Sequence, residues 1–262
     1  MQLLHPFLLL LTATIAQGSA VLPRAATKVL VCSDSTAAEY DPATTNIQGW
    51  AHYLHDYLSI PVSNLALGGR STRSYINQGH WATLLASTNA GDYVIIEMGH
   101  NDDDGSPTTS DRTTLPGIGN NTEVVTNSTG GTETVHSFGW YLRQMIVDIR
   151  AKGAHPVISS MVPRNYWSNN LLQSNWPFAT YAHEVADQVA ALPFVDHNKY
   201  AVNRWQPYGQ TTMKTFFPND NTHTNAAGAI VNAQSFITAL KCAKSPLVAY
   251  LNSMGTGVTG TC

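Results

Sequence analysis

Charged side chains are scarce in this sequence of 262 residues. Asp, Glu, Lys and Arg together make up 12% of it, against roughly 25% in an average globular protein. The 14 basic residues nearly balance the 17 acidic ones, and the net charge is −3. A nucleic-acid-binding protein needs clustered Lys and Arg to neutralise phosphates, so the composition argues against a nucleic-acid partner.

Long hydrophobic runs are also lacking. Residues 6–13 form one apolar run, which is too short to cross a bilayer and is followed by small residues up to Ala20. This pattern is typical of a cleaved secretory signal, although the segment before the run has no Lys or Arg. We therefore expect residues 1–20 to be a signal peptide and the protein to be secreted and extracellular, without a membrane span. We expect residues 21–262 to form a single domain and a monomer.

Cysteine is rare as well, since the chain has only three. In an oxidising compartment we expect Cys242 and Cys262 to form a disulfide worth about 3 kcal/mol, which pins the tail to the last predicted helix. Cys32 lies in an apolar strand and is expected to be a buried small hydrophobe. Sequons at Asn120 and Asn127 suit a secreted glycoprotein, although sequons this short also arise by chance.

The sequence does contain enough apolar residues for a large core, at 43% hydrophobic. Short β-branched runs alternate with longer segments of helical periodicity. The predicted strands cover 28–33, 62–67, 93–97, 156–160 and, more weakly, 194–196; the predicted helices cover 47–58, 138–152, 178–192 and 226–241. Such alternation predicts an α/β fold with a parallel sheet between helices.

One long connection interrupts this alternation. Residues 102–136 are rich in Asp, Gly, Ser, Thr and Asn and have little apolar content. Structureless connections of that length are uncommon and are usually functional or disordered. Because the segment follows a strand directly, we expect it to overhang the ligand crevice at the carboxyl edge of the sheet.

Polar residues and glycines follow three of the predicted strands. Ser35 follows the first predicted strand, and could lie on a turn facing the crevice or simply cap the next helix. Gly68 and Gly69 end the second, where they allow either a close approach to a ligand or an ordinary turn. Asn101 follows the third, and could donate to an oxyanion or form a turn.

Asp220 precedes His223 by three residues, just before the last predicted helix. In one turn the carboxylate can accept the Nδ1 proton and leave Nε2 facing outward, so the pair could orient and activate a serine. A surface histidine is the simpler alternative. A metal site is a poor alternative, because only the distant His100 and Asp102 could supply further ligands.

These blocks come in the order Ser, Gly, Asn, Asp-x-x-His. The sequence resembles the SGNH or GDSL-type serine hydrolases and, within them, the fungal rhamnogalacturonan acetylesterases. The resemblance covers nearly the whole mature chain and rests on SDST at 33–36, GGRS at 68–71, GHND at 99–102, and residues 220–224.

The resemblance implies a flavodoxin-like, three-layer α/β/α fold and assigns roles to the matching residues. Ser35 would be the nucleophile, His223 the general base and then acid, and Asp220 the residue that orients the imidazole. The N–H groups of Ser35 and Gly69 and the amide of Asn101 would form the oxyanion hole, each donor worth about 3 kcal/mol. No metal or cofactor is required.

The sequence departs from the family pattern in two places. Ser33 stands where the first block normally begins with Gly, which could alter the backbone around the nucleophile. The 102–136 insertion has no cysteine, whereas the esterases that the chain resembles can brace this loop with a disulfide.

The substrate is expected to be an acetylated polysaccharide, because the insertion is too polar for a lipase lid. Uronate carboxylates could be bound by Arg70, Arg73 and Arg164, although structural pairing is at least as plausible for Arg70. Tyr166 and Trp167, with Trp176 nearby, lie in an Asn-rich loop where aromatic rings could stack on sugars.

We therefore predict an extracellular esterase that removes O-acetyl groups from plant cell-wall polysaccharide, above all rhamnogalacturonan, by an acyl-serine mechanism. An acetyl-xylan or broad-specificity esterase is the alternative within the same class. A catalytically silent carbohydrate-binding protein is the alternative from another class. Because neutral imidazole is needed as the base, activity should fall in acid.

Overall fold

Five parallel strands form the central sheet of the computed structural model, which describes residues 27–189 and 192–262. The expected signal peptide at 1–20 lies outside the described residues. The strands are β1 (Val29–Ser33), β2 (Val62–Asn64), β3 (Tyr93–Glu97), β6 (His155–Ser159) and β9 (Phe194–Val195), in the order β2-β1-β3-β6-β9. The order reverses between β1 and β3, and a ligand crevice is expected at the carboxyl ends of the strands at such a point.

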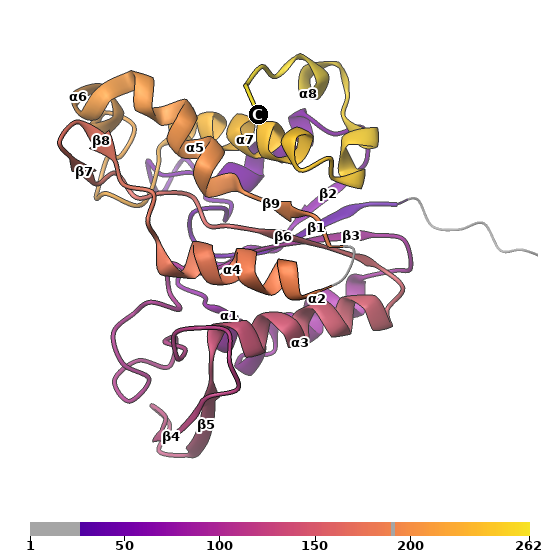
Figure 1. Cartoon of the computed structure of the whole chain (residues 1–262), viewed down its shortest axis with the longest axis vertical. Helices are drawn as coiled ribbons and strands as arrows, with labels where there is room; N and C mark the ends of the chain where they lie inside the picture. The colour runs from indigo at the N-terminus through magenta and orange to yellow at the C-terminus, as the bar shows by residue number, and fades with distance from the viewer. Residues whose placement is uncertain (1–26, 190–191) are drawn as a thin grey trace, which may run out of the picture.

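Helices cover both faces of the sheet, in the three layers that the sequence predicted (Figure 1). One face carries α1 (Thr72–Asn77), α2 (His80–Ser87), α3 (Phe138–Ala151) and α4 (Pro177–Gln188); the other carries the 3₁₀ helices η1 (Trp50–Asp56) and η3 (Pro246–Tyr250) with α5 (His197–Trp205) and α7 (Ala226–Cys242). Further short elements are η2 (Gln206–Tyr208), α6 (Gly209–Lys214), α8 (Ser253–Gly257), and a hairpin of β7 (Trp167–Ser168) and β8 (Leu171–Leu172).

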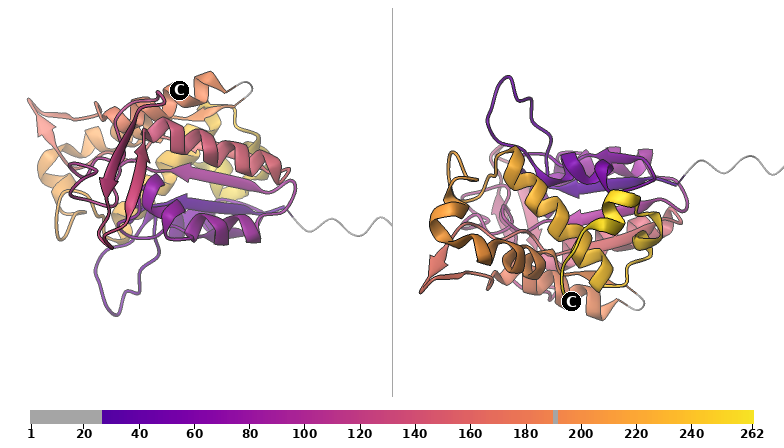
Figure 2. Two further views of the ribbon diagram at one scale, coloured as in Figure 1. Left: turned by 90° about the horizontal axis from the view of Figure 1, so that it is seen from below. Right: turned by 90° about the horizontal axis from the view of Figure 1, so that it is seen from above.

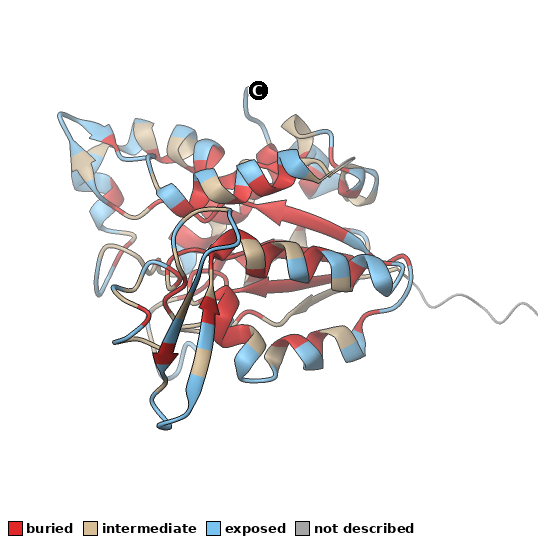
Figure 3. Cartoon of the chain, turned by 60° about the horizontal axis from the view of Figure 1, so that its bottom comes forward, coloured by how far each residue is buried: buried red, intermediate tan, exposed pale blue. Residues whose placement is uncertain are grey.

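Strand β1 contributes side chains to both halves of the core. Its side chains alternate between the two faces because successive residues of a strand point to opposite sides. Val29 and Val31 pack into the cluster beneath α7, while Leu30 and Cys32 pack into the cluster beneath α3 and α4. All four are fully buried, and the strands stand out as the buried centre of the molecule in Figure 3. Burial raises the pKa of the Cys32 thiol, which is expected of an inert core cysteine.

Three predicted elements differ from the structure. The helix expected at 178–192 is α4, which ends at Gln188. Residues 47–58 were expected to form an α-helix, but the segment is the 3₁₀ helix η1, which begins after Gly49 without a capping side chain. The second strand was expected to reach residue 67, but its ladder ends at Asn64. The N–H groups of Leu65 and Leu67 still donate to β1 carbonyls, so the chain stays beside β1 up to the glycine pair.

The 102–136 insertion is not structureless, contrary to the sequence-based expectation. It contains the antiparallel hairpin of β4 (Thr122–Thr126) and β5 (Thr132–His136), which projects at the lower end of the molecule in Figure 1. One side chain of each strand, Val125 and Val135, is buried. The two sequon asparagines lie at its base and its turn, with Asn120 exposed and Asn127 half-buried.

The C-terminal segment is fastened as the sequence predicted. A disulfide joins Cys242, the last residue of α7, to Cys262. No helix among residues 27–189 and 192–262 is long and apolar enough to span a bilayer.

Candidate active site

Ser35 lies in a tight turn at the carboxyl end of β1. The Oδ1 atom of Asp34 accepts hydrogen bonds from the N–H and the hydroxyl of Thr36, each at 2.8 Å, and the Asp34 carbonyl accepts from the Ala37 N–H. Asp commonly folds turns through such side-chain contacts with the backbone. Ser33, which stands in the place of the usual glycine, is buried and donates to the carbonyl of Glu97 on β3. The larger residue is therefore accommodated between β1 and β3.

The loop before α7 brings a histidine and a carboxylate to this serine. His223 Nε2 lies 2.8 Å from Ser35 Oγ, and His223 Nδ1 lies 2.6 Å from Asp220 Oδ2. The other oxygen of Asp220 accepts from the backbone N–H groups of Thr222 and His223 at 2.7 and 2.8 Å, which closes the loop on itself. The three side chains named from the sequence therefore lie in one hydrogen-bonded series.

The carboxylate of Asp220 is kept ionised by its neighbours. Partial burial raises the pKa of Asp220, but hydrogen bonds from His223 and Thr222 outweigh this and hold it below the ordinary value. An ionised Asp220 accepts a hydrogen bond from the Nδ1–H group of His223, so Nε2 keeps its lone pair for the proton of the Ser35 hydroxyl. The arrangement can activate a serine as a nucleophile.

The loop of Gly68 and Gly69 passes beside Ser35, and the Asn101 amide contacts that loop. A Cβ atom placed on Gly68 would be 3.8 Å from the Ser35 Cβ, so the second loop passes directly by the serine. Gly69 follows in the left-handed region with φ +74°, which favours glycine. In the part of the chain that the structure describes, the N–H groups of Ser35 and Gly69 donate to no protein acceptor. The Asn101 amide donates one hydrogen to the Arg70 carbonyl at 3.0 Å and has a second to offer.

Two buried acids support the loops that carry these donors. Asp34 Oδ2 lies 3.1 Å from His100 Nδ1, and His100 Nε2 lies 2.9 Å from the Val162 carbonyl. Burial raises the pKa of Asp34, but the charge and hydrogen bond of His100 and the bonds from Thr36 hold it below the ordinary value. Asp102 accepts from the N–H and hydroxyl of Thr72, yet burial raises its pKa to about 7.

These contacts leave no cluster of metal ligands. His100 is engaged by Asp34 and Val162, so it is not a distant partner of His223. Within residues 27–189 and 192–262, no three His, Cys, Asp or Glu side chains lie together as ligands of a metal ion would.

Arg73 does not line the crevice, so the prediction that it binds a uronate is wrong. The side chain is 0% exposed and forms a two-pronged ion pair with Glu133 of β5, with both N···O distances 2.7 Å. It also donates to the carbonyls of Ser110 and Thr113. Arg73 fastens the insertion to α1. Sequence reasoning could not identify this pair, because Glu133 is 60 positions away.

The two other arginines are also used within the protein. Arg70 donates to the Gly68 carbonyl at 2.7 Å and to Gln78 Oε1 at 3.1 Å. Arg164 donates to the hydroxyl of Thr222, in the loop of Asp220 and His223, and lies over the ring of Trp176. Arg70 and Arg164 remain half-buried, and their contact with a substrate stays a prediction.

A cleft of about 700 Å³ adjoins the catalytic loop, and Tyr166 and Trp167 both line it. The ring of Tyr166 is 41% exposed, and the indole N–H of Trp167 donates to Asn165 at 2.8 Å. The remaining lining residues are Gln173, Gln210, Thr211, Lys214 and Asn221. Lys214 was not identified from the sequence, although it stands only six residues before Asp220. Its ammonium group donates to the Asp220 carbonyl and to the Asn221 side chain, which are both neutral acceptors.

A second cleft, of about 670 Å³, lies beside the loop between β1 and η1, which stands out from the body of the molecule in Figure 2. Tyr40 lines it and donates to the Ser35 carbonyl at 3.2 Å. One cleft is therefore lined by Asn221, the neighbour of Asp220, and the other by Tyr40, which contacts Ser35.

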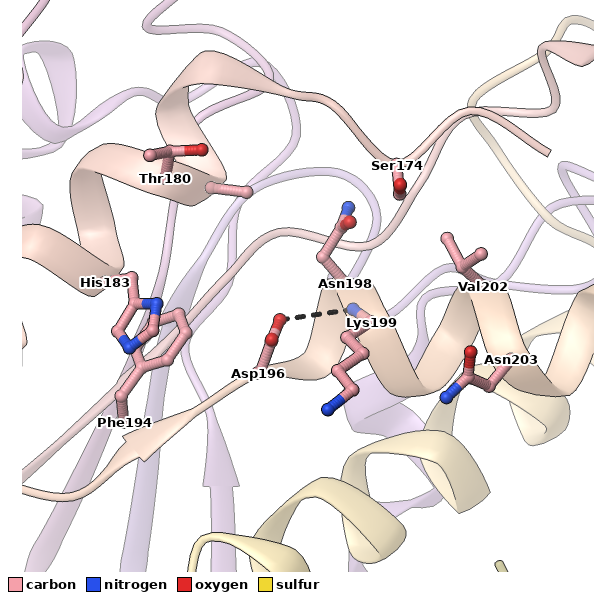
Figure 4. Close-up of a pocket in the computed structure, with 10 residues that line it drawn as sticks. Ser174, Thr180, His183, Phe194, Asp196, Asn198, Lys199, Val202 and Asn203 are labelled. Atoms are coloured by element: carbon pink, nitrogen blue, oxygen red, sulfur yellow. Dashed lines mark hydrogen bonds between the residues drawn. The ribbon is translucent and has the colours of Figure 1, made fainter. Parts of the chain in front are cut away.

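A third cleft, of about 350 Å³, lies between α4 and α5 and is drawn in Figure 4. Asp196 caps α5 there by accepting from the Lys199 N–H, and His183 stacks on Phe194. None of its lining residues belongs to the catalytic series or carries one of the donors beside Ser35.

Comparisons with known proteins agree with this site. Residues 34–229 match the GDSL-like Lipase/Acylhydrolase family. A rhamnogalacturonan acetylesterase of Emericella nidulans is 40% identical over 226 residues, which cover 85% of this chain and 88% of that protein. A probable rhamnogalacturonan acetylesterase of Bacillus subtilis, YesY, is 26% identical over 85% of this chain and 96% of its own length. The crystal structure of the protein YXIM from Bacillus subtilis aligns with a TM-score of 0.68 at 22% identity, over 86% of this chain and 58% of that one.

Proposed function

The chain belongs to the GDSL-like Lipase/Acylhydrolase family and is a carboxylic ester hydrolase, and from that premise we propose that it is a secreted acetylesterase acting on rhamnogalacturonan. The observation that carries the proposal is the hydrogen-bonded series of Ser35, His223 and Asp220. The named relatives supply the substrate class, since two of them carry the name rhamnogalacturonan acetylesterase.

In the proposed mechanism, the Ser35 hydroxyl attacks the carbonyl carbon of an O-acetyl group. His223 Nε2 takes the hydroxyl proton, while Asp220 holds the ring and stabilises its positive charge. The oxyanion accepts hydrogen bonds from the N–H groups of Ser35 and Gly69 and from the amide of Asn101. His223 then gives the proton to the sugar oxygen as its bond to the acetyl carbon breaks, and the sugar leaves as an alcohol. Water activated by the same ring hydrolyses the acetyl-enzyme, which releases acetate and restores Ser35.

The cleft lined by Asn221 and the cleft lined by Tyr40 suit an extended polymer rather than a small ester. The cleft with Tyr166 and Trp167 combines aromatic faces with amide side chains, a lining that suits sugar rings and their hydroxyl groups. Lys214 gives this cleft a positive charge that is not opposed by a carboxylate among its lining residues. We therefore assign to Lys214 the contact with a uronate carboxylate that the sequence had suggested for Arg73.

The mechanism is tested by measuring acetate release from acetylated rhamnogalacturonan, acetylated xylan and p-nitrophenyl acetate. We expect Ser35→Ala to abolish hydrolysis of all three, and the exposed Ser253→Ala on α8 to have no effect. Unchanged hydrolysis by Ser35→Ala would refute the serine mechanism. Polysaccharide binding without hydrolysis by the native protein would favour a silent binding protein, and equal or faster release from xylan would refute the substrate assignment.

The acidic substrate is tested separately with Lys214→Met. We expect this variant to raise KM for acetylated rhamnogalacturonan several-fold, because an exposed ion pair is worth up to about 1 kcal/mol. KM for p-nitrophenyl acetate, which has no carboxylate, should not change. If KM rises equally for both, Lys214 acts by holding the catalytic loop and not by binding a uronate.

A further inference from the structure

The insertion places a guanidinium group behind the proposed oxyanion hole. Arg112 Nη1 donates to Asn101 Oδ1 at 3.1 Å. The same nitrogen lies 3.4 Å from the point where a Cβ atom on Gly69 would stand. Arg112 thus contacts one proposed donor directly and lies against the backbone of another.

The contact with Arg112 helps to fix how the Asn101 amide is turned. The Nδ2 group donates to the Arg70 carbonyl while Oδ1 accepts from Arg112, so the two ends are held by partners of opposite kind. If the amide rotated by 180°, Nδ2 would face the Arg112 donor and Oδ1 would face the Arg70 carbonyl. Both bonds would be lost, and an acceptor could then face the oxyanion.

Arg112 is itself held within the insertion. Its Nη2 atom lies 2.5 Å from Asp104 Oδ2, and the Ser110 hydroxyl donates to the same oxygen at 2.8 Å. The Arg112 N–H also donates to Ser110 Oγ. These contacts join the start of the insertion to its middle and hold the guanidinium in place, although the Arg112 side chain is 40% exposed.

We propose that Arg112 is a positioning residue that holds the Asn101 amide with its N–H toward the oxyanion. The inference rests on the proposed function, since it concerns the donor that Asn101 would provide. It gives the 102–136 insertion a part in catalysis that does not require it to cover the site.

The test is a double-mutant cycle of Arg112→Ala and Asn101→Ala with p-nitrophenyl acetate, which has no carboxylate for Arg112 to bind. We expect Arg112→Ala to lower kcat about 10-fold with little change in KM, less than the roughly 100-fold loss when a whole donor is removed. In the Asn101→Ala background, Arg112→Ala should cost nothing further. Arg112→Lys should restore part of the loss, because it keeps a donor at this position.

Arg143→Ala is the matched control. Arg143 anchors the same insertion through the Ile118 carbonyl at 2.6 Å, but no hydrogen bond joins it to Asn101. It should leave kcat unchanged, and thermal unfolding of every variant checks that the fold is intact.

Several outcomes would overturn the proposal. Losses that add in the double variant, or an equal loss in Arg143→Ala, would mean that Arg112 acts by general stabilisation of the insertion. An effect confined to KM for the acidic polymer would make Arg112 a substrate contact. If Asn101→Ala retained full kcat while Ser35→Ala abolished it, the role of Asn101 and this inference would fall, and the serine mechanism would stand.

Discussion

Replacing Glu133 by Gln should destabilise the protein without changing its affinity for substrate. The variant keeps the size of the side chain but removes the charge that faces Arg73, whose side chain is fully buried. Breaking a buried ion pair by removing one partner costs about 3–5 kcal/mol, because the other charge is left uncompensated. Glu133 is 16% exposed and Gln can still accept a hydrogen bond, so we expect about 3 kcal/mol.

The measurement is the unfolding midpoint together with kinetics on acetylated rhamnogalacturonan. A loss of about 3 kcal/mol should lower Tm by roughly 6–12 °C, since each kcal/mol shifts a chain of this size by about 2–4 °C. Glu123→Gln, on the neighbouring strand β4, is the control, because no side-chain hydrogen bond or ion pair of Glu123 occurs in the described part of the chain. KM should be unchanged in both variants at a temperature where they are folded.

The pH dependence gives a further check. The hydrogen bond and charge of Arg73 hold the pKa of Glu133 below its ordinary value, against the effect of burial. A lowered folded-state pKa stabilises the protein at neutral pH, and that contribution is lost as pH falls through the folded value. The difference between the native protein and Glu133→Gln should therefore shrink in acid. An unchanged Tm combined with a raised KM for the acidic polymer would refute the reasoning and would indicate that Arg73 contacts the substrate.

Three other predictions follow from the site and its supports. Asp102→Asn should stabilise the protein more at pH 8 than at pH 5, measured by urea unfolding. Burial raises the folded-state pKa of Asp102 to about 7, so the stability of the native protein falls as pH rises toward that value. An equal effect at both pH values would contradict this. Cys242→Ser should lower the free energy of unfolding by about 3 kcal/mol relative to the oxidised native protein. Under reducing conditions, the variant and the native protein should be equally stable. Hydrolysis of p-nitrophenyl acetate should fall in acid, because a protonated His223 cannot accept the Ser35 proton, and a flat pH profile through the histidine range would exclude that base.

The strands were predictable because their signal is local. Buried parallel strands are continuous apolar runs, and β1 and β3 were located to within one residue on that basis. The placement of the motifs that follow these strands was also predictable, since residues at the carboxyl ends of parallel strands meet at one edge of the sheet. The short helix α1 was missed because its six residues include the β-branched Thr72 and Ile76 and show no clear apolar stripe.

The roles of the arginines could not be read because they depend on distant partners. Arg73 stands two residues from the end of the GGRS block, which made a substrate contact plausible, yet its partner Glu133 comes from the insertion. Arg112 lies in a polar segment where sequence shows no periodicity, and only the fold brings it to Asn101. An arginine near a motif is therefore not enough to identify a substrate contact unless the carboxylates around it are known.

Many of the few charged residues near the crevice are used in contacts within the protein. Several of the few charged side chains hold the segments around the crevice. Asp34 contacts His100, Arg73 pairs with Glu133 and joins α1 to the insertion, and Arg112 pairs with Asp104 within the insertion. Hydrogen bonds of this kind are directional, and they would preorganise the proposed oxyanion hole at no cost during the reaction. Charges used in this way are not available to bind substrate. In the cleft that Tyr166 and Trp167 line, recognition of an acidic polymer would then depend on Lys214, while most of the binding energy would come from neutral contacts with sugar rings and hydroxyl groups.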